Sequence, residues 1–220
     1  MRVLGALIVS LAFLAGCGGG DGDTTTTDSV ATGTDECASV EAPEARDPAP
    51  GQAPSKPLDA SKTYTLTFDT SCGSFTITLD QELAPKTAAS LVALANAGYF
   101  DDTIFHRVVP GFVIQGGDPT QSGGGGPGYS TVDPPPAEAA AYTKGVVAMA
   151  KSGVEAPGTG GSQFFVVTSE TAADVLTPDY SIVGEVTEGM DTVERIDALG
   201  VSDGPPSQPV VVNTVTAASS

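Results

Sequence analysis

The sequence predicts a mostly β domain, a closed barrel of eight short strands with one helix over each end. Apolar residues alternate with threonines on both sides of a short turn near residue 71, which is the pattern of a β-hairpin. Further short strand-like runs follow along the chain, as in small closed barrels. Only two segments have the spacing of an amphipathic helix. The number of strands alone leaves a two-sheet sandwich as the alternative.

A hairpin and a helix are the first predicted elements. Apolar residues alternate in the runs 64–68 and 75–79, and the turn between the two runs ends at Gly73. The spacing then changes to that of a helix, which begins at Pro85, a residue suited to the first helical position, and ends at Gly98. The remaining strands are predicted at 103–109, 112–115, 146–150, 163–168, 182–186 and 209–216, and a second helix at 190–199, closed by Gly200.

The first residues have the layout of an export signal. Arg2 is followed by an apolar run, 3–15, that is shorter than the ~20 residues needed to span a bilayer. The run ends in the tetrapeptide 14–17, Leu-Ala-Gly-Cys, which resembles a bacterial lipobox. We therefore predict a lipoprotein signal peptide over 1–16. Cys17 would be acylated (a palmitate-type modification) and anchor the chain at the extracytoplasmic face of a bacterial cell membrane. An ordinary signal peptide with an incidental cysteine is the alternative.

The number of cysteines, three, agrees with the predicted extracytoplasmic location. With Cys17 carrying lipid, Cys37 and Cys72 are left, and thiols outside the cytoplasm tend to be paired. We predict a disulfide between them, which would tie the N-terminal region to the turn around residue 72. Two free thiols are the alternative.

Composition divides the rest of the chain into a tether and a domain. Residues 17–60 are rich in Gly, Thr, Asp and Pro and contain almost no large apolar side chain. Such a segment cannot bury enough surface to offset the entropy lost on ordering. We predict a disordered tether over 17–60, held only near Cys37, and a folded domain over 61–220.

The net charge of −18 excludes several partners. Nucleic acid binding depends on Lys and Arg, and anionic lipid surfaces attract the same side chains. The acidity is interpreted as a means of keeping the protein soluble. We expect no nucleic acid partner, membrane contact only through the lipid anchor, and a monomer.

No familiar catalytic cluster is visible. With one histidine the chain cannot form a His-based metal centre. The glycine-rich run 122–128 lacks the Lys-Ser/Thr ending of a phosphate loop and is interpreted as a surface loop, and 160–164 lacks the last Gly of a nucleophile elbow. If the chain is an enzyme, it is expected to need no metal, cofactor or covalent intermediate.

The run 105–118, FHRVVPGFVIQGGD, has an unusual pattern. A Pro-Gly turn at 110–111 separates two short strands that carry Arg107 and Gln115. The two side chains are either a solvated arginine with an edge glutamine, or a polar pair beside an apolar pocket.

The same run resembles the signature of the cyclophilin family of prolyl isomerases. Two further blocks resemble that family in the same order, 145–150 with 161–165, and 180–186 with 188–190. With the first hairpin and helix, the resemblance covers nearly everything from 64 to 216. It implies an eight-stranded antiparallel closed barrel capped by two α-helices, in agreement with the periodicity.

The resemblance also implies roles for individual residues. Arg107 matches the catalytic arginine, and Gln115 and Gln163 match the polar pair that orients the substrate backbone. The other substrate-binding matches are Phe112, Val113 and Phe165 around the proline ring, Ala150 and Lys151 beside the preceding residue, and Leu176 and Tyr180 in the pocket.

Two positions depart from the family pattern. The pocket-edge tryptophan that is prominent in cyclosporin binding falls at Val175, so weak binding of that drug is expected. Tyr180 stands where many members have His, and it keeps a ring with a hydrogen-bonding tip. The loop 151–161 is longer than in compact members, which leaves substrate preference open. His106 is interpreted as scaffold.

Together these features predict a peptidyl-prolyl cis–trans isomerase that acts on X–Pro bonds of exported proteins. The mechanism would be non-covalent, with Arg107 stabilising the twisted amide. A binding module that only holds proline-containing segments is the main alternative, and a purely structural surface lipoprotein is another. Arg107 favours catalysis, because a docking surface does not need a cation directed at the proline nitrogen.

Overall fold

The computed structural model describes residues 36–48 and 50–220. They all belong to one of the two compact units of the chain, Gly33–Ser220. The predicted signal peptide over 1–16 and the predicted lipidation site Cys17 lie outside the described residues and stay predictions. Neither helix in the described part of the chain is long and apolar enough to cross a bilayer.

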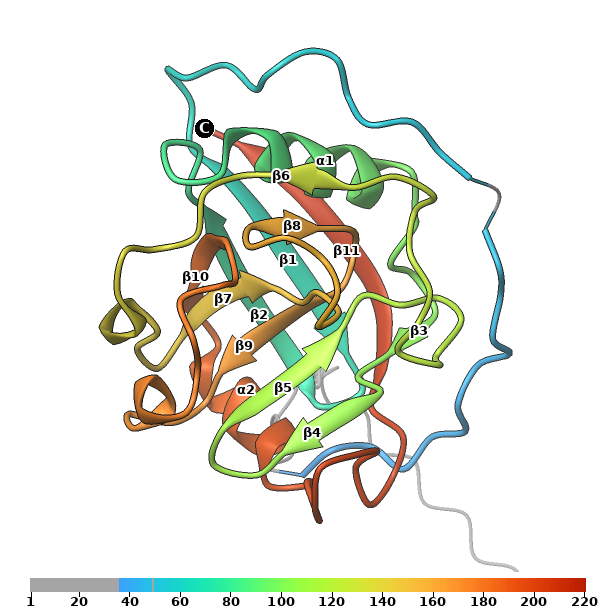
Figure 1. The fold of residues 1–220 in the computed structure, drawn as a ribbon. Helices are drawn as coiled ribbons and strands as arrows, with labels where there is room; N and C mark the ends of the chain where they lie inside the picture. The colour runs from blue at the N-terminus through green and yellow to red at the C-terminus, as the bar shows by residue number, and fades with distance from the viewer. Residues whose placement is uncertain (1–35, 49) are drawn as a thin grey trace, which may run out of the picture. The chain divides into compact units, whose positions relative to one another are not determined.

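One antiparallel sheet forms the body of the domain (Figure 1). Its nine strands lie in the order β3-β11-β1-β2-β10-β7-β9-β5-β4. Their bounds are β1 Tyr64–Thr70, β2 Gly73–Leu79, β3 Thr103–Ile104, β4 Arg107–Val109, β5 Val113–Gly116, β7 Val146–Met149, β9 Phe164–Val167, β10 Ile182–Glu188 and β11 Val211–Ser219. A separate pair, β6 (Thr131–Val132) and β8 (Thr159–Gly160), was not predicted.

The prediction of a closed eight-stranded barrel is wrong, because the sheet is open. Its edge strands β3 and β4 pair with β11 and β5 and not with each other. The predicted strand 103–109 is in fact two strands, with Phe105 and His106 between them. Both of these neighbours are buried, whereas consecutive strand residues point to opposite faces. The chain therefore leaves the ladder here and passes from one edge of the sheet to the other.

The two predicted helices are present. Helix α1 spans Pro85–Asn96 with Pro in its first turn, and Gly98 follows it in the left-handed conformation (φ 65°) that glycine adopts without strain. Helix α2 spans Met190–Asp197, two residues shorter than predicted. Figure 1 shows the helices at opposite ends of the sheet. Two single turns of 3₁₀-helix, η1 (Ala139–Ala141) and η2 (Ala172–Asp174), complete the fold.

The apolar residues form two clusters on the two faces of the sheet. The larger is an aromatic core in which Phe68 and Phe75 stack with ring centroids 4.9 Å apart and Phe164 packs against Phe68. The smaller contains Phe165 and Val113. Phe164 and Phe165 are neighbours in β9, so the alternation of the strand sends one ring to each cluster. The smaller cluster forms the floor of the site described below.

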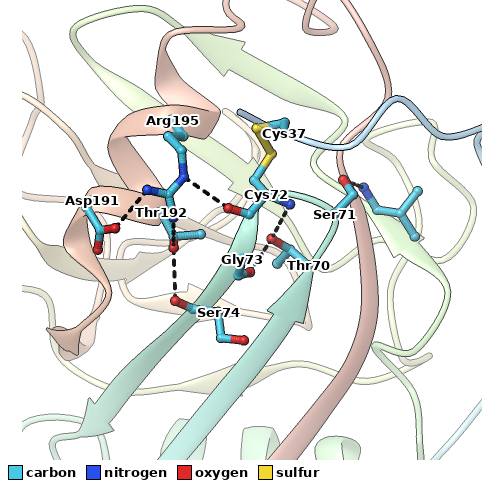
Figure 2. The surroundings of a disulfide bond; sticks show 10 residues. Cys37, Thr70, Ser71, Cys72, Gly73, Ser74, Asp191, Thr192 and Arg195 are labelled. Carbon is cyan, nitrogen blue, oxygen red and sulfur yellow. Dashed lines mark hydrogen bonds and ion pairs between the residues drawn. A yellow bond between two sulfur atoms is a disulfide. The ribbon is translucent and has the colours of Figure 1, made fainter. Parts of the chain in front are cut away.

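The predicted disulfide between Cys37 and Cys72 is present, with Cα atoms 4.0 Å apart (Figure 2). Cys72 lies in the β1–β2 turn, where its N–H donates to Thr70 Oγ1 at 3.1 Å. Its carbonyl accepts a hydrogen bond from Arg195 Nε of α2 at 3.1 Å. The half-cystine in the turn is thus held by β1, α2 and the N-terminal segment together.

The N-terminal segment contacts the domain at more points than the sequence predicts. Beyond Cys37, hydrogen bonds join Arg46 and Gly51 to loops of the domain, and Figure 1 shows the segment as the blue trace outside the strands. These contacts run mainly through backbone groups, so the polar composition of 17–60 gave no sign of them. We call residues 37–48 and 50–51 the strap. The domain boundary at 61 stays a prediction.

Candidate active site

A cavity of about 380 Å³ opens above the smaller apolar cluster. It is lined by Arg107, Phe112, Val113, Gln115, Ala150, Lys151, Phe165, Val175, Leu176, Thr177 and Tyr180. Every residue predicted to be catalytic or substrate-binding lines this cavity except Gln163. The cavity thus brings together residues that are distant in the sequence: its outermost members, Arg107 and Tyr180, are 73 positions apart.

Strand register explains why the central residues meet. Arg107 of β4 is paired with Gln115 of β5, and Gln115 is paired with Phe165 of β9. Directly paired residues on neighbouring strands point to the same face. Val113, two residues before Gln115, shares that face and contributes to the floor of the cavity.

Aromatic rings build one wall of the cavity. Phe165 is 5 % exposed, and its ring meets that of Tyr180 edge to face with centroids 5.4 Å apart. Tyr180 is held from behind by Tyr142, whose hydroxyl donates to the Tyr180 carbonyl and accepts from its N–H. Burial raises the pKa of Tyr142 to about 12, so this hydroxyl stays protonated and remains a donor. Lys151 places its ammonium 5.6 Å from the centre of the Tyr180 ring.

A chain of hydrogen bonds fixes the polar side of the cavity. Arg107 Nη1 donates to Gln115 Oε1 at 3.2 Å, and Gln115 Nε2 donates to Gln163 Oε1 at 3.1 Å. Gln163 Nε2 in turn donates to the carbonyls of Gly123 and Gly125, both at 2.9 Å. Gln163 lines a neighbouring groove of about 680 Å³, which Gln115 shares. The polar pair expected from the sequence is therefore a relay from Arg107 to the glycine-rich loop.

Asp118 organises that loop from inside. Its carboxylate accepts hydrogen bonds from the N–H groups of Thr120, Gly123 and Gly125. Burial by itself would raise the pKa of Asp118, but these bonds and the Thr120 hydroxyl outweigh it and hold the pKa below its ordinary value. Gly125 leaves no room for a side chain, because a Cβ there would lie 2.1 Å from Asp118 Oδ1.

Asp203 is a site residue that the sequence did not reveal. Its carboxylate binds Arg107 through two contacts, Nε to Oδ1 at 2.5 Å and Nη2 to Oδ2 at 3.2 Å. The bond from Arg107 lowers the pKa of Asp203. The loop that carries Asp203 is attached to β4 by a bond from Val108 N–H to the Gly204 carbonyl at 2.8 Å. One aspartate in a turn, among 27 acidic residues, carries no distinguishing signal.

Two further positions clarify the shape of the site. Val175, at the rim, is 71 % exposed and places no large ring over the cavity. His106 is 9 % exposed, and neither ring nitrogen has a hydrogen-bond partner among the described residues. Burial lowers the pKa of His106, as does the charge of Arg107, while Asp118 opposes the change. His106 does not line the cavity, in keeping with a scaffold position.

Comparison with known proteins places this arrangement in a family. Residues 65–217 match the family model described as cyclophilin type peptidyl-prolyl cis-trans isomerase. A probable peptidyl-prolyl cis-trans isomerase A of Mycobacterium leprae is 39 % identical over 69 % of this chain and 91 % of its own length. A peptidyl-prolyl cis-trans isomerase-like 2 of Cryptococcus neoformans is 37 % identical over 73 % of this chain, which spans only 28 % of that longer protein.

A solved structure agrees with these matches. The crystal structure of a Cryptosporidium parvum cyclophilin type peptidyl-prolyl cis-trans isomerase has a TM-score of 0.63 and 28 % identity, covering 71 % of this chain and 98 % of the other. The family model spans all the strands around the cavity and both helices. On this agreement of sequence, fold and site, the chain belongs to the cyclophilin-type peptidyl-prolyl cis–trans isomerase family.

Proposed function

We propose that the chain accelerates cis–trans rotation about X–Pro bonds with Arg107 as its catalytic residue. The observation that carries this proposal is the position of the Arg107 guanidinium. It stands at the edge of the cavity, beside the apolar floor of Val113 and Phe165, and is held on one side by Gln115 and on the other by Asp203.

The reaction sets a particular requirement. Amide resonance gives the peptide bond a rotation barrier of ~18–20 kcal/mol, and uncatalysed X–Pro exchange takes tens to hundreds of seconds. In the twisted state the proline nitrogen becomes pyramidal and its lone pair is localised. A catalyst must therefore stabilise the twisted amide more than either planar isomer.

Arg107 meets this requirement as a permanently charged donor. A guanidinium directed at the proline nitrogen gains a hydrogen bond only when the lone pair is available, so it lowers the barrier selectively. Asp203 and Gln115 hold three of its nitrogens, which limits rotation of the side chain. An acceleration of ~10⁵ corresponds to roughly 7 kcal/mol of selective stabilisation.

The apolar walls have a separate role. Phe165 and Val113 are almost fully buried, and Phe112 is half-buried beside them. A proline ring seated against these groups would be held still and shielded from water, which strengthens the interaction between Arg107 and the nitrogen. A crystal structure of the Cryptosporidium relative was determined in the presence of the dipeptide Ala-Pro, so we choose Ala-Pro peptides as probes.

Exchange of a short Ala-Pro peptide, followed by NMR or by a protease-coupled assay, tests the assignment. Arg107→Ala is expected to lower kcat by at least ~100-fold while circular dichroism and thermal melting stay close to wild type. Phe112→Ala is expected to raise KM as well, because it removes a wall of the cavity. Arg107→Ala with wild-type activity would refute the role of Arg107.

The physiological substrates we propose are exported proteins that pass the extracytoplasmic membrane face. This rests on the predicted lipobox at 14–17 and on the disulfide between Cys37 and Cys72, a bond that persists in oxidising compartments. Cell fractionation tests the anchor. Wild type is expected with the membranes and Cys17→Ala in the soluble fraction, and a Cys17→Ala protein that stays with the membranes would overturn it.

A further inference from the structure

The strap lies outside the part of the chain that the family shares. The family model begins at residue 65, whereas the strap comprises residues 37–48 and 50–51. It is covalently fixed at its start by the disulfide from Cys37 to Cys72. Directly after it, the Ala38 N–H donates to the Ser71 carbonyl at 2.7 Å.

From there the strap reaches the loop 118–128 and binds it at three separate points. Arg46 N–H donates to the Pro119 carbonyl at 3.0 Å, and Gly51 N–H donates to the Pro127 carbonyl at 2.7 Å. Gln121 Nε2 of the loop donates to the Pro43 carbonyl at 2.9 Å. The backbones also touch closely at the far end of the loop, where a Cβ on Gly128 would lie 2.6 Å from Pro50.

Arg46 is the anchor of the strap. Its Nη2 contacts the carbonyls of Gly98, Tyr99 and Asp101, with distances of 3.3, 2.7 and 2.5 Å. These carbonyls follow the C-terminus of α1, where the partial negative charge of a helix favours a cation. The side chain thus fixes the strap to a rigid element, while its backbone N–H holds the loop.

The loop is the outer end of the relay to Arg107. Its carbonyls at Gly123 and Gly125 accept hydrogen bonds from the Gln163 amide. Further hydrogen bonds join Gln163 to Gln115 and Gln115 to Arg107. The run 122–126 is almost entirely glycine and contributes no apolar side chain to either core cluster. A segment with so few buried contacts has little stability of its own, so its position depends on what binds it.

We propose that the strap is a positioning element of the isomerase site, with Arg46 as its key residue. It restrains the glycine-rich loop from outside, while Asp118 restrains it from inside, and the restrained loop carbonyls orient Gln163, Gln115 and finally the guanidinium of Arg107. The inference rests on the proposed function of Arg107. Opening the disulfide frees one end of the strap, so the activity is also sensitive to reduction.

The relay predicts which kinetic constant changes. Phe112 and Phe165, which would seat the proline ring, belong to the smaller apolar cluster, whereas Cys37 of the strap packs against the larger one, so substrate binding and KM are expected to stay close to wild type. The orientation of Arg107 matters in the twisted state, and misplacement of a catalytic group by ~1 Å can cost up to ~100-fold in rate. Because Asp203 still holds Arg107 from the other side, we expect a loss in kcat of ~3- to 10-fold.

The experiment compares Arg46→Ala with Lys56→Ala in the mature chain, using Ala-Pro peptide exchange. Lys56 is an exposed cation of the same N-terminal segment, beyond the strap, with no hydrogen bond described for its side chain. Arg46→Ala is expected to lower kcat as above with KM unchanged, and Lys56→Ala to behave as wild type. Amide hydrogen exchange at Gly123 and Gly125 is expected to accelerate only in Arg46→Ala.

A double-mutant cycle separates positioning from a general loss of stability. If the strap acts through the relay, Arg46→Ala adds no further loss to Gln163→Ala. Fully additive losses, or an Arg46→Ala protein with wild-type kcat, overturn the proposal. Should Arg46→Ala fail to fold, Gly51→Pro decides in the same assay, because it removes the N–H that binds Pro127 and places a ring against that carbonyl, which loosens the strap from the loop without changing Arg46. A wild-type protein without isomerase activity would refute the proposed function itself, which is a different outcome.

Discussion

Removal of the disulfide is expected to lower the stability of the domain by an amount that the structure lets us calculate. The double variant Cys37→Ala/Cys72→Ala deletes one covalent link and, unlike serine, places no new hydroxyl at the buried Cys72 position. That link closes a loop across a sequence separation of 35 and joins the strap to the β1–β2 turn. The turn stays hydrogen-bonded to Arg195 of α2, so the folded state keeps its local geometry.

The magnitude follows from chain entropy. A cross-link over a separation of 35 removes loop-closure entropy from the unfolded chain worth about 4 kcal/mol at 25 °C. The strap has few buried apolar contacts, so in the variant its first residues can detach and regain part of that entropy in the folded state. We therefore expect a loss in the free energy of unfolding of about 2 to 4 kcal/mol, and a fall in Tm of roughly 5 to 15 °C.

Urea unfolding of the oxidised wild type and the variant, followed by far-UV circular dichroism, measures this difference. The m value is expected to rise in the variant, because an unfolded chain without the cross-link exposes more surface. Reductant should shift the wild-type curve to that of the variant and leave the variant unchanged. A loss below about 1 kcal/mol, or a reductant effect on the variant, would refute the reasoning from chain entropy.

Two further predictions concern Asp203 and His106. Asp203→Asn is expected to lower kcat by ~2- to 5-fold, because the two contacts of Asp203 orient Arg107. Its Tm should change little, because an exposed ion pair adds little stability. Asp203→Glu should recover part of the lost kcat, and an unchanged kcat in Asp203→Asn would contradict this role. Burial holds the pKa of His106 below 6.5, so the unfolded chain binds a proton there at a higher pH than the folded chain does. The free energy of unfolding should therefore fall as the pH drops from about 6.5 towards the lower folded pKa, and His106→Phe should lack this component; identical pH profiles from pH 7 to 5 would show that His106 does not contribute it.

Local patterns determined the elements of the fold that depend on neighbouring residues. The hairpin around Gly73 follows from period-two alternation, and α1 follows from Pro85, the apolar spacing and Gly98. The Cys37–Cys72 pair followed from the count of three cysteines, once Cys17 was assigned to the predicted lipobox. Each of these inferences uses information that lies within a short window or in a simple count.

Whether the sheet closes into a barrel could not be predicted from such local patterns. A run such as 103–109 has strand propensity throughout, but whether it forms one strand or two depends on which side chains the rest of the protein buries. Phe105 and His106 both enter the interior, so the ladder breaks and the sheet stays open. Burial of two consecutive residues is a tertiary property that alternation cannot encode.

The residues of the site also fall into two groups, those that motifs predict and those that only the folded chain brings together. Arg107, Gln115 and Phe165 could be predicted from motifs, and the structure places them around one cavity because they are paired across β4, β5 and β9. Asp203 and Arg46 could not be predicted. Their partners, Arg107 and the carbonyls after α1, lie 96 and more than 50 residues away, and the interactions arise only once the chain has folded.

The sequence by itself thus determined the mostly β class, the first hairpin and the two helices through local periodicity, and most residues that line the cavity through motifs that resemble the cyclophilin family. Only the tertiary structure decided what holds those residues in place. A hydrogen bond between a side chain and a distant carbonyl leaves no pattern in composition or spacing. The open sheet, the pairing of Arg107 with Asp203 and the contact of the strap with the glycine-rich loop are therefore properties of the folded chain alone.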